Sequence, residues 1–202
     1  MQTVDSGASS TSWFARGVWA VLVLLALGTL GLMWWWDTEP DHFDPVEVAR
    51  QRASLNNQRV VVGSATTAAL VRSAEVMLDK RGGYLSNDKF PPGVIMDNMP
   101  NWEFGVVTAS RDLTRALRNE FSRSQTQSVE DKDLQEAEPL FSSPNDRWLL
   151  PSSESQYRKA IERIESYADR LADDHPPGAT RYTRVDTLAT FLPSVSTRLG
   201  SL

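Results

Sequence analysis

The stretch of this sequence with the most varied chemistry is PPGVIMDNMPNWEFG, residues 91–105. It holds five side chains that can bind, stack or transfer protons: Asp97, Asn98, Asn101, Trp102 and Glu103. Two carboxylates in different environments can work as an acid and a base, and glycoside hydrolysis needs such a pair about 5–10 Å apart. With Trp102 stacking on a sugar, one hypothesis is a glycan-binding or glycan-processing site built on the carboxylates of residues 88–103.

The same residues also allow a purely structural interpretation, which we favour. Asp97 and Asn98 suit the side-chain-to-backbone hydrogen bonds of a turn. Glu103 suits the first turn of a helix, where a negative charge meets the positive end of the helix dipole. Trp102 and Phe104 suit the filling of a core. In this interpretation the loop locks two helices together.

A third interpretation makes the loop a contact surface for an envelope protein or a glycan. Met96 and Met99 would then adapt to the partner beside Trp102, since methionine side chains are flexible and polarizable. The burial of Trp102 separates the last two interpretations, because a core plug hides the ring and a recognition loop leaves it partly open.

A second group of candidates follows the loop. Arg111, Arg115 and Arg118 recur at spacings of four and three, which places them on one side of a helix. We favour a solvated face with weak ion pairs. The alternative is a ridge that binds phosphates or a carboxylated glycan.

The composition disfavours several classes of function. The chain has no cysteine, which removes disulfides, thiolate metal sites and cysteine nucleophiles. Its two histidines, His42 and His175, are too few for the usual zinc sites. We therefore predict no metal site, no cofactor and no catalytic residue. The net charge of −5 and the lack of a basic stripe argue against nucleic acid as a partner.

Residues 17–36 form an apolar segment that bears on where the protein lies in the cell. They read GVWAVLVLLALGTLGLMWWW and carry no charge. As a helix, this run is long enough to cross about 30 Å of hydrocarbon. Tryptophans at both ends of the wider segment 13–36 fit interfacial belts. The apolar run exceeds the roughly 7–15 residues of a signal peptide, and no small-residue cleavage motif follows. We therefore predict an uncleaved, single transmembrane helix over 13–36.

Basic residues predict its orientation. Arg16 lies directly before the uncharged run 17–36, whereas the next basic residues after that run are Arg50 and Arg52, so the N-terminus is expected in the cytoplasm. The predicted divisions are a cytoplasmic leader (1–12), the span (13–36), a juxtamembrane spacer (37–59) and an extracytoplasmic α-helical domain (60–202). In a Gram-negative cell this domain lies in the periplasm, anchored to the inner membrane.

Helical spacing of apolar residues after position 60 predicts an all-α helical bundle with one long ordered loop, 84–101. Helices are expected within 63–83, from Asn101 to Phe121, within 131–140, from Ser153 to Leu171, and from Ala179 onward. The expected boundary residues are a cap at Ser64 or Thr66, a cap at Asn101, an end at Pro139 and a capping box at Ser153 with Gln156. Between the third and fourth of these helices, Trp148, Leu149 and Leu150 are expected to point inward.

The segments GGYLSND, PPGVIMDNMPNWEFGVV, RDLTRALRNEFSRSQTQS, EAEPLF and WLLPSSESQYRKAIERIESY occur in this order. Together they resemble a bacterial family known as domain of unknown function number 2333, over about residues 60–199. The resemblance implies an inner-membrane-anchored protein of Gram-negative bacteria and brings no activity or site residues with it. We expect a single-pass membrane protein with a non-catalytic scaffolding or interaction domain, and the glycan-directed enzyme is the alternative.

Overall fold

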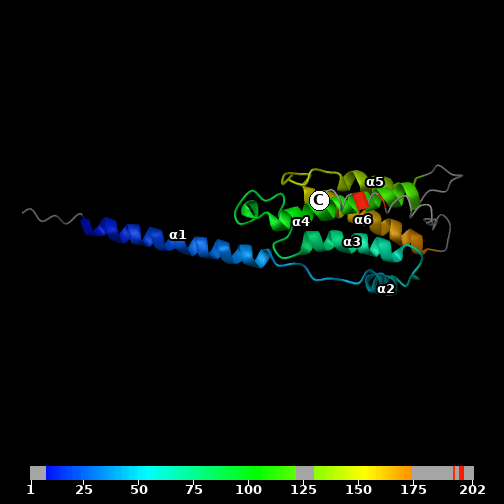
Figure 1. Cartoon of the computed structure of the whole chain (residues 1–202), viewed down its shortest axis with the longest axis horizontal. Coiled ribbons are helices and arrows are strands. Elements are labelled where there is room, and N and C mark those ends of the chain that lie inside the picture. Colours follow the sequence, from blue (N-terminus) through cyan, green and yellow to red (C-terminus); the bar gives the residue numbers. More distant parts are fainter. Residues whose placement is uncertain (1–7, 122–129, 174–192, 194–195, 198–202) are drawn as a thin grey trace, which may run out of the picture.

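The computed structural model describes residues 8–121, 130–173, 193 and 196–197. In these residues it contains six α-helices, a 3-10 turn (η1, Gly93–Ile95), a π-helical turn (η2, Leu117–Phe121) and no strand. This confirms the all-α class. The first helix extends as a rod from one end of a bundle formed by the others (Figure 1).

The rod is α1, Ala8–Trp36. Its segment Trp13–Trp36 is long and apolar enough to cross a membrane, and its residues are exposed or, as at Trp36, half-buried. At about 1.5 Å per residue a helix of this length exceeds the roughly 30 Å of a bilayer core. An N-terminal signal sequence has the same features, so the helix itself is consistent with an anchor or a signal peptide.

The bundle is built from α3 (Ser64–Asp79), α4 (Asn98–Ala116), α5 (Lys132–Phe141) and α6 (Ser153–Ala172). In α3 and α6 the apolar residues at helical spacing form one buried face, because residues three and four apart lie on the same side of a helix. Their fully or almost fully buried members are Leu70, Ala74, Met77, Leu78, Tyr157, Ala160, Ile161, Ile164 and Tyr167. Leu117, Leu134, Ala137 and Phe141 from the other helices complete the core.

Part of the predicted spacer also belongs to a helix, α2 (Pro45–Leu55). It begins where the side chain of Asp44 accepts a hydrogen bond from the backbone N–H of Val46, at 2.8 Å, with Pro45 in the first turn. Arg52 then binds Glu165 at 3.0 Å and Asp169 at 3.2 Å on α6. These contacts hold α2 against the bundle.

Several predicted helix boundaries are wrong. The cap of α3 is Gly63, whose φ of 106° lies in the left-handed region, and not Ser64 or Thr66. The helix α4 begins at Asn98 rather than Asn101. Pro100 is tolerated in its first turn, because the backbone N–H that proline lacks would have no partner there.

Two further boundaries need the same correction. Pro139 lies inside α5, which continues to Phe141. Ser152, and not Ser153, caps α6, since its hydroxyl accepts a hydrogen bond from the N–H of Ser155 at 3.3 Å. The helix predicted from Ala179 onward lies outside the described residues.

Candidate functional site

The centre of the candidate site is the carboxylate of Glu103, which lies in the second turn of α4. The N–H groups of Leu85 and Ser86 donate to it at 2.8 Å each, and the Ser86 hydroxyl donates at 2.6 Å. Lys80, at the end of α3, donates to it from its ammonium group. We call this group of four residues the Glu103 clamp. It ties the end of α3, the start of the loop and the start of α4 to one another.

The clamp is sealed from solvent. The side chains of Glu103 and Lys80 are 0% and 3% exposed. A buried charge is tolerated when a partner of opposite charge and hydrogen bonds satisfy it, and here both carboxylate oxygens are engaged. The carboxylate therefore works as a structural joint, and a sugar approaching from solvent has no access to it.

An aromatic cluster lies under the loop. The rings of Tyr84 and Tyr157 meet edge-on, with centroids 5.7 Å apart, and Phe141 stacks on Tyr157 at 6.2 Å. Both hydroxyls donate to backbone carbonyls of a second loop, residues 142–152, at Asn145 (2.9 Å) and Ser143 (3.2 Å). Burial raises the pKa of each phenol, so both tyrosines stay neutral donors.

Further hydrogen bonds join the two loops directly. Asn87 donates to the carbonyl of Arg147 at 3.2 Å, and Lys89 donates to the carbonyl of Asp146 at 3.3 Å. Asp88, between these donors, is partly buried; burial and then the nearby charge of Glu103 raise its pKa. The loops therefore form one connected surface at one end of the bundle.

This surface carries exposed apolar side chains. The loop between α3 and α4 presents Phe90, Val94 and Ile95, and the 142–152 loop presents Trp148, Leu149 and Leu150. We call these six residues the apolar tip. The prediction that residues 148–150 point inward is wrong, because Tyr84, Tyr157 and Phe141 already fill the core beneath them. Phe104, expected to plug the core, is 56% exposed on α4.

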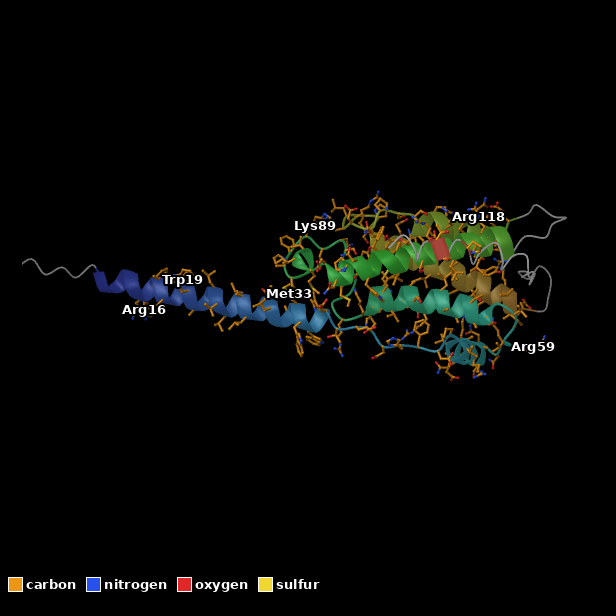
Figure 2. The ribbon with its side chains drawn as sticks, viewed as in Figure 1. Arg16, Trp19, Met33, Arg59, Lys89 and Arg118 are labelled. Carbon is orange, nitrogen blue, oxygen red and sulfur yellow. The ribbon has the colours of Figure 1, made fainter. Side chains whose placement is uncertain are left out.

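The apolar tip lies at the end of the bundle that faces α1 (Figure 1). A Cβ on Gly82 would lie 2.7 Å from Cδ2 of Trp36, so the indole at the end of α1 packs directly against that glycine. Asn98 donates to the carboxylate of Asp37 at 3.3 Å. In Figure 2 Lys89, next to the tip, lies at the same end as Met33, whereas Arg59 lies at the opposite end of the bundle.

The other predicted loop residues fall around this surface. Asp97 and Asn101 are exposed, and Asn98 is exposed apart from its bond to Asp37. Trp102 is half-buried and packs against the core cluster. Its ring is therefore neither fully hidden nor freely presented.

The three arginines, for which we favoured a solvated face over an anion-binding ridge, lie further along α4 and η2, and each is paired with a carboxylate. Arg115 and Arg118 both bind the carboxylate of Glu138, at 2.7 Å and 2.6 Å. Arg111 lies 3.6 Å from Asp112. The hydrogen bond from Arg115 to Glu138 raises the pKa of the guanidinium. The ridge and the loop thus occupy different parts of α4 and do not form one site.

A family model described as "Uncharacterized protein conserved in bacteria (DUF2333)" matches residues 8–202. The match confirms the resemblance seen in the sequence and extends it through the apolar helix. No curated protein and no solved structure matches the chain.

Proposed function

The chain belongs to this uncharacterised bacterial family, and from that premise we propose a single-pass inner-membrane protein with a non-catalytic periplasmic interaction or scaffolding domain. The observation that carries the proposal is the docking of α1 on the loop surface. Trp36 packs against Gly82, and Asp37 accepts a hydrogen bond from Asn98. A cleaved signal peptide would have no reason to take part in the packing of the mature domain.

The orientation rests on charge. Arg16 precedes the apolar segment without an intervening residue, and Arg50 is the first basic residue after it. Because positive residues stay on the cytoplasmic side, the bundle would lie in the periplasm.

The non-catalytic character rests on the Glu103 clamp. The loop's best candidate for an acid or base is buried, and backbone donors and Lys80 occupy it. The exposed groups that border the tip, Asp97, Asn101 and Phe104, suit contact with a partner.

Topology and processing can be tested together, because the chain has no cysteine and any introduced thiol is unique. We would place cysteines at Ser6 before the span and at Ser54, an exposed residue of α2. In cells with a permeabilised outer membrane, an impermeant maleimide should label Ser54→Cys and leave Ser6→Cys unlabelled until lysis. The reverse pattern would refute the orientation.

Mass spectrometry of the purified protein supplies the second readout. An intact mass that retains residues 13–36, with the protein held in membranes during alkaline extraction, supports the anchor. A mature chain that begins after Trp36 would show that α1 is a cleaved signal sequence.

A further inference from the structure

We propose that the apolar tip inserts into the surface of the same bilayer that α1 spans, so that the domain is held against the membrane at two places. This inference rests on the proposed function, since it requires α1 to remain as an anchor. It names the lipid surface as the partner of the tip.

The first support is the distance of the tip from the end of the span. Asn98 is hydrogen-bonded to Asp37, the residue directly after α1. Ile95 lies three residues before Asn98, and an extended chain covers at most about 3.6 Å per residue, so Ile95 lies within about 11 Å of that point along the chain. This edge of the tip is therefore confined to the region where α1 leaves the hydrocarbon.

The second support is the match in residue type. Trp34 and Trp35, at the end of α1, are exposed and belong at the membrane interface. The tip adds Trp148, Phe90 and four aliphatic residues of the two loops to this set. Lys89 and Arg147, both exposed at its edge, can reach lipid headgroups while the apolar residues enter the acyl boundary.

The third support is the tether. A domain fixed to the bilayer by its own span meets lipid at a high effective concentration, so a few apolar side chains suffice for insertion. A soluble partner protein would have to displace lipid from a surface that already lies beside the membrane.

Single cysteines test the proposal on the full chain in phosphatidylcholine nanodiscs. We would label Leu150→Cys and Ile95→Cys with an environment-sensitive fluorophore, then measure quenching by doxyl-labelled phosphatidylcholine and by aqueous iodide. The matched control is Leu55→Cys, because Leu55 and Leu150 are 82% and 92% exposed and Leu55 is the last residue of α2. In Figure 1 α2 lies away from α1, toward the opposite end of the bundle.

We expect lipid quenching at residues 150 and 95 several-fold above that at residue 55, with iodide showing the opposite order. Equal iodide access at all three positions would overturn the proposal. Capture of a second protein on the tip, with lipid quenching absent, would overturn it as well.

A fourth label separates this outcome from a failure of the anchor. Leu24→Cys lies within the apolar segment of α1. If lipid quenches residue 24 and leaves the tip positions unquenched, the anchor holds and the tip proposal falls. If residue 24 is also unquenched, the proposed membrane anchorage itself has failed.

Discussion

Replacing Glu103 with glutamine is the sharpest perturbation of the loop. Both carboxylate oxygens accept hydrogen bonds, so either orientation of the amide sets its NH2 group against a donor. The charge of Lys80, 3% exposed, also loses its counterion. Removing one partner of a buried ion pair costs about 3–5 kcal/mol. Since the free energy of unfolding of a domain is about 5–15 kcal/mol, this loss would be a large share of its stability.

The assay is urea unfolding of the full chain in detergent micelles, followed by far-UV circular dichroism. Glu103→Gln, Lys80→Met and the double variant form a cycle. We expect the double variant to be more stable than the sum of the single losses predicts, by at least about 1 kcal/mol, because it leaves no unpaired charge.

The control is an exposed ion pair of similar residue types. Arg72 and Glu75 lie 3.4 Å apart on the surface of α3, and Glu75→Gln should cost less than about 1 kcal/mol. If Glu103→Gln costs no more than this control, the clamp does not hold the loop. Glu103 would then return as a candidate for chemistry.

Two further predictions concern the joint with α1 and the acid stability of the bundle. Both glycines have positive φ, so the backbone strain of an alanine is common to the two sites, but only at Gly82 would the added Cβ clash with Trp36. Gly82→Ala should therefore lower the free energy of unfolding by about 1–3 kcal/mol more than Gly83→Ala does. Paired unfolding curves in micelles measure the difference, and equal losses would contradict it. Burial raises the pKa of Asp133, but hydrogen bonds from Arg170 and a neighbouring serine outweigh it, and the net pKa is lowered. This stabilisation is present above the unfolded pKa, about 4, and is lost as pH falls through the lowered folded value. Asp133→Asn should therefore have a lower free energy of unfolding at pH 7, and that free energy should fall less steeply as the pH is lowered. A pH dependence equal to that of the wild type would contradict this.

The helical core was predictable because its signal is local. In α3 and α6 the apolar residues recur every three or four positions, and the charged residues between them are exposed or half-buried. In α4 the spacing of apolar residues alone does not describe the buried face. Its buried line runs through Glu103, Val107, Ser110, Thr114 and Leu117, so polar residues occupy much of that face.

The clamp and the tip were not predictable for the opposite reason. The partners of Glu103 lie 17 to 23 residues away, and an acidic residue near a helix start has an ordinary surface explanation. The available signal was its spacing of four from Val107 along a buried line. Trp148 and its two neighbours resembled a core segment, because sequence alone does not show that the tyrosines beneath them fill the available space.

The arginine ridge supports one last prediction, which concerns Glu138. This carboxylate, 11% exposed, accepts hydrogen bonds from Arg115 and Arg118, so the ridge already holds its anion. In the wild type, phosphate at low millimolar concentration, where its general stabilising effect on folded proteins is negligible, should not raise the unfolding midpoint above that in chloride. The free energy of unfolding of Glu138→Gln should fall by about 1.5–3 kcal/mol for each charged hydrogen bond that is removed. Phosphate should restore part of this loss.

Arg72→Gln, on the surface of α3, serves as the control that changes charge without exposing the ridge. If phosphate stabilises the wild type and its effect is unchanged in Glu138→Gln, the arginines bind an external anion in spite of their internal partner. The ridge would then replace the loop as the first place to look for a ligand. If only the Glu138 variant responds, the arginines serve to join α4 and η2 to α5, and ligand recognition is left to the loop surface beside α1.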